Sequence, residues 1–300
     1  MVYDTLIIGG GPAGLTAAIY ASRFKLSAIV IAKDRGGLLQ LVHKIENWPG
    51  EKSISGIDLM NKMIDHVKHF DVPVEDDEVV SIEKPENFIV KTKQGKEYEA
   101  KTIIVATGTQ RRKLGVPGEK EFFGRGVSYC ATCDAPFFKD KNVGVVGGSD
   151  ASAVEALMIA EHAKKVYIIY RKAEIRAEPI TKEKIANTKN IEIITNTNVT
   201  EIKGDKMVTS VMFDNGKEFP LDGLFIEIGG TPISMLVEKL GAKLNEKGEI
   251  ITDDSSKTNI NGLFAAGDVT DCTYKQAIVA SAEAAMAAFS AFKFKMEQKS

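Results

Sequence analysis

The sequence is poor in the residues on which several classes of protein depend. Three cysteines among 300 residues are too few for the disulfide framework of a small secreted domain, which favours a cytoplasmic location. The four histidines are scattered along the chain and give no ligand spacing for zinc. We therefore expect a cytoplasmic protein without a bound metal.

Net charge and long apolar runs are also scarce. A formal net charge of -2 gives no electrostatic reason to expect a nucleic acid as partner. No apolar run reaches about 18 residues without a charge, so we expect no membrane span. The alanine-rich stretch 277–292 is interpreted as a buried helix. A strand-like run begins at Tyr3, so we also expect no signal peptide.

The chain does contain one structural plan that occurs twice. Each copy has an apolar run, a glycine-rich turn, a helical pattern and a second apolar run, followed by short strands and a last strand that ends in glycine. The first copy spans residues 6–108 and the second spans residues 143–229. Alternating strands and helices predict parallel sheets that are covered by helices.

A further strand at 262–266 ends in Gly-Asp and opens no third copy, so we expect it to rejoin the sheet of the first copy. The second copy is then an insertion. The predicted fold class is α/β, with two Rossmann-like nucleotide-binding domains of three ββα layers, the second inserted into the first. Residues 1–113 and 246–300 are predicted to form the first domain, and residues 114–245 the second. The two crossings between them lack periodicity and are predicted hinges.

The turn from Gly9 to Gly14 follows a strand and opens a helix, which is the context that a dinucleotide-binding fingerprint requires. Gly9 permits the tight turn, Gly11 lets a pyrophosphate approach the backbone, and Gly14 allows the helix and the strand to pack closely. The start of the helix at Pro12 and Ala13 adds N–H groups and a positive partial charge. We predict a dinucleotide site here, and the alternative is a turn with a purely structural role.

A carboxylate that usually binds a ribose hydroxyl is missing from the end of the second strand. Asp34 could reach the hydroxyl, or the site does without a carboxylate. The segments around Gly37 and residues 46–50 are rich in turns and suited to closing over a flat ring. Trp48, the only tryptophan, fits this position or a place in the core under a loop.

Cys130-Ala-Thr-Cys133 lies between the two glycine-rich turns and is followed by Asp134. A zinc site would need further ligands at suitable spacing, which are lacking. A CxxC sequence favours the thiolate and closes an easily exchanged ring, so we predict a redox-active pair. Asp134 could pass protons to and from a leaving thiolate, or cap a helix, and both roles are compatible. Cys272 is predicted to be inert.

Together these motifs resemble a low-molecular-weight thioredoxin reductase along essentially the full length of the chain. The motifs that match are GGGPAG, ENWPG, VATG, GRGVSYCATCD, IRAE, FAAGDVTD and YKQAIVASAEAAMAA. The resemblance implies FAD in the first domain, NADPH in the second, a homodimer, and thioredoxin or a related small disulfide protein as partner. It also implies that Cys133 faces the flavin and that Cys130 attacks the partner.

The resemblance also implies the residues that hold each cofactor. FAD is expected to contact the first glycine turn, Gly267 and Asp268 through its diphosphate and ribityl portion, and Gln276 near its ring. The other FAD contacts expected are Gly37, Asn47, Ala106, Thr107, Gly108 and Ala277. The NADPH contacts expected are Gly147, Gly148, Ser149, Asp150, Ala151, Arg171, Lys172 and Arg176. The three cations in this set suit the 2′-phosphate of NADPH.

Ser149 departs from the family pattern, because it stands where a glycine usually lets the nucleotide approach. A Cβ must be accommodated there, and an electron donor other than NADPH is the alternative. Arg125 and the adjacent Phe137 and Phe138 flank the dithiol. We predict that they dock the partner, and the alternative is that both rings lie in the core.

The dithiol precedes the second copy, so it belongs to the same domain as the expected nicotinamide site. Rotation of this domain on its two crossings is expected to bring each of them to the flavin in turn. The motifs leave three alternative functions. The reductase of an alkyl hydroperoxide system normally has an extra N-terminal region, and a ferredoxin–NADP reductase lacks the CxxC. A flavin-containing redox sensor or a dinucleotide-binding module would have no enzymatic activity.

Overall fold

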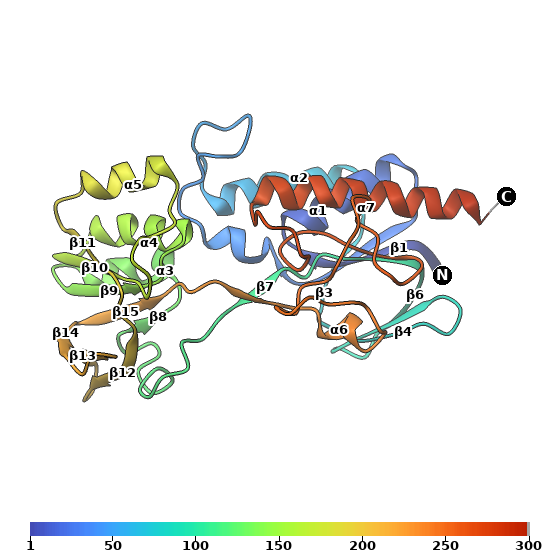
Figure 1. Cartoon of the computed structure of the whole chain (residues 1–300). Helices are drawn as coiled ribbons and strands as arrows, with labels where there is room; N and C mark the ends of the chain where they lie inside the picture. The colour runs from blue at the N-terminus through green and yellow to red at the C-terminus, as the bar shows by residue number, and fades with distance from the viewer. Residues whose placement is uncertain (299–300) are drawn as a thin grey trace. The chain divides into compact units, whose positions relative to one another are not determined.

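The computed structural model describes residues 1–298 and divides into two compact units (Figure 1). The first unit comprises Met1–Gln110 and the chain from Thr231 onward, and the second comprises Arg111–Gly230. The second unit is therefore inserted into the first, as the fold class predicted. The two crossings pair as a two-stranded sheet of β7 (Thr109–Arg111) and β16 (Gly230–Pro232).

The second boundary differs from the one placed after residue 245. The short helix α6 (Met235–Glu238) and the segment after it pack with the first unit. Val237 and Ala242 are buried in the same cluster as Leu6 and Ile103 of its central sheet. This apolar contact is long-range, so the sequence around residues 231–245 gave no local sign of it.

A seven-stranded sheet forms the centre of the first unit. Its order is β3-β2-β1-β6-β5-β4, with β17 paired to β6 beside this path. The strands are β1 (Val2–Gly10), β2 (Ala28–Arg35), β3 (Val74–Asp76), β4 (Val79–Glu83), β5 (Phe88–Thr92), β6 (Glu97–Val105) and β17 (Leu263–Ala265). Pairing is parallel from β3 to β6 and to β17, and antiparallel among β4, β5 and β6. The prediction that the strand after residue 262 rejoins this sheet is confirmed.

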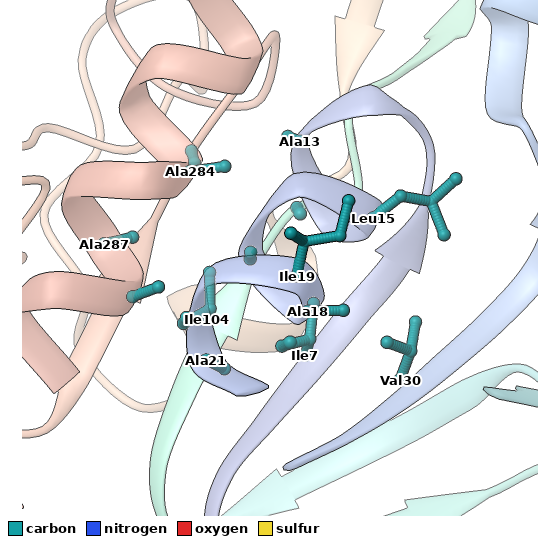
Figure 2. Close-up of a cluster of buried hydrophobic side chains, with 14 of the residues drawn as sticks. Ile7, Ala13, Leu15, Ala18, Ile19, Ala21, Val30, Ile104, Ala284 and Ala287 are labelled. Carbon is teal, nitrogen blue, oxygen red and sulfur yellow. The ribbon is translucent and has the colours of Figure 1, made fainter. Parts of the chain in front are cut away.

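Helices α1 (Pro12–Arg23) and α7 (Ala277–Glu297) pack together over the central strands of this sheet (Figure 1). Figure 2 shows Ala284 and Ala287 of α7 facing α1, above Ile7 and Ile104 of the sheet. Fully buried alanines on both helices let the two backbones approach closely. Besides α6, the described part of this unit contains the helices η1 (Gly37–Leu41) and α2 (Gly56–His69). Among the described residues, α7 is the one helix long and apolar enough to cross a membrane, and its inner face is part of this core.

The second unit has three layers. Its parallel sheet has the order β11-β10-β9-β15-β8, and a three-stranded antiparallel sheet has the order β12-β13-β14. The strands are β8 (Val127–Ser128), β9 (Asn142–Val146), β10 (Lys165–Ile169), β11 (Ile191–Ile194), β12 (Val199–Gly204), β13 (Val208–Phe213), β14 (Glu218–Pro220) and β15 (Gly223–Ile226). The helices are α3 (Ala131–Asp134), η2 (Ala135–Phe138), α4 (Asp150–Ala160) and α5 (Pro179–Ala186). One core cluster joins the helices to the parallel sheet and another joins the two sheets, which confirms the ββα layering.

Candidate active site and nucleotide turns

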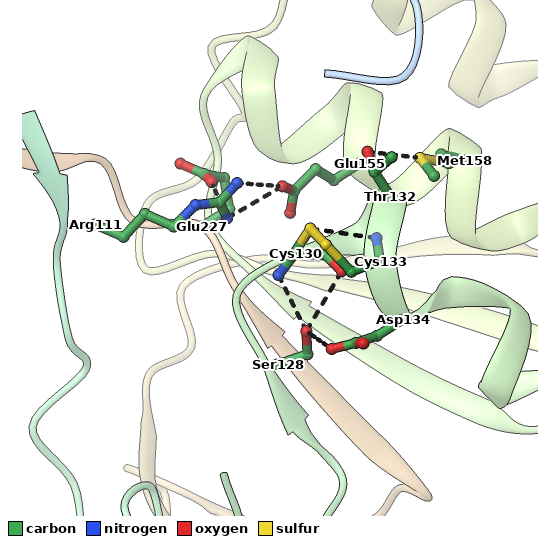
Figure 3. The surroundings of a disulfide bond; sticks show 9 residues. All are labelled: Arg111, Ser128, Cys130, Thr132, Cys133, Asp134, Glu155, Met158 and Glu227. Carbon is green, nitrogen blue, oxygen red and sulfur yellow. Dashed lines mark hydrogen bonds and ion pairs between the residues drawn. A yellow bond between two sulfur atoms is a disulfide. The ribbon is translucent and has the colours of Figure 1, made fainter. Parts of the chain in front are cut away.

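Cys130 and Cys133 form a disulfide at the start of α3 (Figure 3). Cys130 is the N-cap of this short helix, and its Sγ accepts a hydrogen bond from the Cys133 N–H at 3.2 Å. Cys133 is exposed and Cys130 is half-buried. A disulfide on the surface of its unit is accessible to thiol–disulfide exchange.

Asp134 follows the disulfide, and its carboxylate is held by a serine. The Ser128 Oγ–H donates to Asp134 Oδ2 at 2.6 Å, and the Cys130 N–H donates to the same Oγ at 3.0 Å. Asp134 is the N-cap residue of η2, but its side chain makes no capping hydrogen bond. The capping role proposed from the sequence is therefore wrong.

A group of charged side chains lies among the surroundings of the disulfide and was missed by the sequence analysis (Figure 3). Arg111 pairs with Glu155 of α4 at 3.3 Å and with Glu227 at 3.0 Å. Burial raises the pKa of Glu155 to about 7, the Glu227 carboxylate adds to this rise, and Arg111 opposes it. The one available signal was an acidic residue in an otherwise apolar helix, since Glu155 stands in ASAVEALMIA.

The first glycine turn, Gly9–Gly14, combines three crowded glycines, which are Gly9, Gly10 and Gly14, with one open glycine, Gly11. A Cβ on Gly9 would lie 2.1 Å from the Ala106 carbonyl oxygen, and a Cβ on Gly14 would lie 1.9 Å from that of Gly9. A Cβ on Gly11 would meet nothing within 4 Å. The helix that follows has no capping side chain and no acidic residue in its first turn. This arrangement leaves space and positive partial charge for a diphosphate.

Other residues expected to contact FAD gather around this turn. Gly37 lies beside Gly11, because a Cβ on Gly37 would come within 3.3 Å of the Gly11 Cα. Gly267 lies beside Ala13, since a Cβ on Gly267 would come within 3.1 Å of the Ala13 Cβ. Ala106 touches Gly9, as described above. The structure therefore brings four separate segments of the first unit together at the carboxyl ends of its parallel strands.

The loop after β17 presents a carboxylate near this turn. The Gly267 N–H donates to Glu283 of α7 at 2.7 Å, which fixes the backbone before Asp268. Burial raises the pKa of Asp268, and Lys275 opposes this rise. A half-buried carboxylate of this kind favours hydrogen-bond donors, and the hydroxyls of a ribityl chain are suitable donors.

The remaining FAD candidates lie on three loops of the first unit. The Asn47 Nδ2 donates to the Gln276 Oε1 at 3.2 Å, and Gln276 is the N-cap residue of α7, directly before Ala277. Thr107 donates through its Oγ1 to the Ile233 carbonyl at 2.7 Å, next to Gly108. Asp34 is exposed at the end of β2. Trp48 is half-buried, so it is not the core residue considered as the alternative.

The second glycine turn, Gly147–Ser152, accommodates the unusual serine without strain. Ser149 is the N-cap of α4 with φ -84° and ψ 172°, and its Oγ accepts the Ser152 N–H at 3.4 Å. Asp150 accepts the Glu178 N–H at 2.9 Å, which holds its carboxylate on a neighbouring segment. A Cβ on Gly147 would lie 2.1 Å from the Glu227 carbonyl oxygen. The turn is closely packed against the end of β15, and Ala151 follows in the first turn of the helix.

The cations expected at the NADPH 2′-phosphate are exposed. Arg171 and Lys172 follow the end of β10, and Arg176 approaches the glycine turn through its backbone. The Arg176 N–H donates to the Gly148 carbonyl at 2.7 Å. The fold thus brings Arg176, 27 residues from Ser149, into a β-bridge with it. Positive side chains beside a glycine turn suit a phosphorylated ribose.

The residues flanking the dithiol do not behave as one docking pair. Phe137 is 80% exposed, whereas Phe138 is 8% exposed and packs edge-to-face on Phe225 at 5.2 Å between ring centroids. The prediction that Phe138 docks the partner is therefore wrong, because the ring fills the core under α3. Arg125 is exposed and donates to the Glu121 carbonyl.

Comparison with known proteins agrees with this geometry. The family model described as pyridine nucleotide-disulphide oxidoreductase matches residues 3–284. Thioredoxin reductase of Peptoclostridium litorale is 41% identical over 98% of this chain and 97% of its own. That of Bacillus subtilis is 38% identical over 96% of this chain and 93% of its own. The crystal structure of Lactococcus lactis thioredoxin reductase has a TM-score of 0.95 and 37% identity, and covers 98% and 99% of the two chains. The chain therefore belongs to the pyridine nucleotide-disulphide oxidoreductases and, within them, to the low-molecular-weight thioredoxin reductases.

Proposed function

We propose that this chain reduces the disulfide of thioredoxin, or of a related small disulfide protein, with electrons from NADPH. The observation on which this rests is the exposed Cys130–Cys133 disulfide with the carboxylate of Asp134 beside it. When bound, FAD accepts hydride from NADPH and supplies an electron pair to a disulfide. The test is anaerobic reduction of the purified protein by NADPH, followed by an insulin-disulfide assay with thioredoxin.

The reduced dithiol performs the exchange with the partner. We assign the attack to Cys130, whose thiolate displaces one sulfur of the partner disulfide and forms a mixed disulfide. Cys133 then attacks Cys130, releases the second partner sulfur as a thiolate, and restores the Cys130–Cys133 bond. We assign the proton transfers to Asp134. Its carboxylate takes the proton of the attacking thiol and returns it to the partner thiolate that leaves.

We assign FAD to the first unit and NADPH to the second. The uncapped start of α1 and the space over Gly11 suit the FAD diphosphate, and the half-buried Asp268 suits a hydroxyl-bearing chain. The second glycine turn with its exposed cations suits the phosphates of NADPH. Because the disulfide and the NADPH turn belong to the same unit, we propose that rotation on the β7 and β16 crossings brings each in turn to the flavin.

The assembly that we propose is a cytoplasmic homodimer. Tyr20, Met286 and Phe289 are large apolar side chains that are each exposed by 36% or more on α1 and α7 of the first unit. The ring of Phe24 packs near two of them, with centroid distances of 6.3 Å to Tyr20 and 5.7 Å to Phe289. An apolar surface of this kind supports self-association. The net charge of -2 supports a partner other than a nucleic acid. Sedimentation velocity measures the mass of the particle in solution and tests whether it is a dimer.

Replacing Arg171 with alanine is expected to raise the KM for NADPH roughly 10- to 150-fold, because a hydrogen bond to a charged group contributes about 1.5–3 kcal/mol. The KM for NADH, which has no 2′-phosphate, should stay unchanged. Lys164→Ala is the control, since it removes one exposed positive charge from the same unit. Similar wild-type KM values for NADPH and NADH would contradict recognition of the 2′-phosphate. If neither nucleotide reduces the flavin, the electron donor is a different one.

The two phenylalanines after the dithiol should respond in opposite ways. Phe137→Ala is expected to raise the thioredoxin KM roughly tenfold at an unchanged melting temperature, because an exposed ring can anchor a transient partner. Phe138→Ala should leave this KM unchanged and destabilise the protein by about 3–5 kcal/mol, because it leaves a cavity beside Phe225. Steady-state kinetics and thermal melting distinguish the two effects. An unchanged KM in Phe137→Ala would place the docking surface elsewhere.

A further inference from the structure

Ser128 is a buried polar residue next to the disulfide for which the reaction described above has no role. It is 3% exposed and forms, with Val127, the two-residue strand β8. Its backbone pairs in register with Phe225 of β15, which is fully buried. The position of its Oγ is therefore set by the parallel sheet of the second unit. A rigid strand fixes a functional group more accurately than a loop does.

The hydrogen bonds of Ser128 connect the dithiol to the acid. A hydroxyl has one proton to donate, and the 2.6 Å distance to Asp134 Oδ2 assigns that proton to the carboxylate. The lone pairs of Oγ then accept the Cys130 N–H at 3.0 Å. One atom in the sheet therefore contacts both the backbone of the residue assigned the attack and the residue assigned the proton transfer (Figure 3).

We infer that Ser128 is a positioning residue that holds Asp134 and Cys130 in the geometry required for proton transfer between them. By donating to Oδ2, it leaves Oδ1 as the oxygen that takes the proton from the Cys130 thiol. The resulting thiolate attacks the partner disulfide, and the proton passes from Oδ1 to the partner thiolate that leaves. This inference rests on the proposed function of Asp134.

A double-mutant cycle tests whether Ser128 acts through Asp134. Ser128→Ala is expected to lower the kcat for thioredoxin reduction roughly 10- to 150-fold, which is the decrease expected from losing one hydrogen bond to a charged group. FAD content and the rate of flavin reduction by NADPH should match wild type. Asp134→Asn should lower kcat at least as much, and Ser128→Ala should cost little more in the Asp134→Asn background.

Ser128→Thr is the matched variant, because it keeps the hydroxyl at a strand position where a β-branched residue is tolerated. It is expected to recover most of the kcat that Ser128→Ala loses. Losses that multiply in the double variant, or failure of threonine to recover activity, would show that Ser128 acts only on the local fold. If Asp134→Asn is impaired and Ser128→Ala is not, the positioning role alone is wrong. Full activity in Asp134→Asn would overturn the proposed proton transfer and this inference together.

Discussion

Replacing Cys130 with serine is expected to abolish thioredoxin reduction while the protein stays folded and yellow. A serine hydroxyl is not ionised at neutral pH and cannot form a disulfide, so the attack on the partner is lost. Removal of a catalytic nucleophile typically costs roughly four or more orders of magnitude in kcat. The measurement is the rate of insulin-disulfide reduction in the presence of thioredoxin and NADPH.

FAD content should not change in Cys130→Ser, because every residue assigned to FAD belongs to the first unit and Cys130 belongs to the second. Reduction of an artificial dye by NADPH should continue, since a dye takes electrons without the dithiol. Cys272→Ser is the matched control, because Cys272 is the unpaired cysteine among the described residues and lies in the first unit. It should retain thioredoxin reduction. Loss of FAD in Cys130→Ser would contradict the assignment of separate roles to the two units.

The features that the sequence predicted correctly are those that depend on local patterns. Apolar runs ending in glycine gave the parallel strands of both units. The spacing of Gly9, Gly11 and Gly14 predicted two crowded positions and one open position, and the structure has this arrangement. Both patterns arise because backbone geometry acts over a few residues.

The features that were missed depend on contacts between segments far apart in the chain. Phe137 and Phe138 are adjacent and identical in type, and only the position of Phe225 decides that one is buried. The second unit ends at Gly230 rather than at residue 245, because Val237 is buried in a cluster with residues of the first sheet. Arg111, Glu155 and Glu227 are separated by 44 or more residues and meet only in the folded chain.

Whether the backbone at position 149 accommodates a side chain depends on its φ and ψ angles, which the sequence does not reveal. A Cβ is disfavoured at a glycine with φ between about +20° and +160°, but Ser149 has φ -84°. The family pattern of glycine at this position therefore does not reflect a requirement of the backbone. We propose that it reflects the approach of a ligand, and substitutions in the first glycine turn test this proposal.

Gly11 and Gly14 of that turn are expected to respond differently to replacement by alanine. Gly11 is the N-cap of α1 with φ -79° and ψ -172°, which is nearly the conformation of Ser149 in the second turn. Alanine at position 11 therefore brings no backbone strain, and its Cβ meets no protein atom within 4 Å. The methyl group would stand in the space assigned to the FAD diphosphate. We expect Gly11→Ala to lower FAD affinity at least about tenfold, a change of about 1.4 kcal/mol.

Gly14→Ala should behave differently, because its Cβ would lie 1.9 Å from the backbone oxygen of Gly9. Neither backbone segment can move without separating α1 from β1, so the folded state itself is destabilised by about 1–3 kcal/mol or more. The two effects are separated by measuring the melting temperature after FAD has been removed, and the dissociation constant for FAD added back. Gly11→Ala should melt with the wild-type apoprotein and bind FAD weakly, whereas Gly14→Ala should melt earlier before any FAD is added. Wild-type FAD affinity in Gly11→Ala would show that the diphosphate does not lie over Gly11, and equal melting of the two apoprotein variants would contradict the close packing of Gly14 on Gly9.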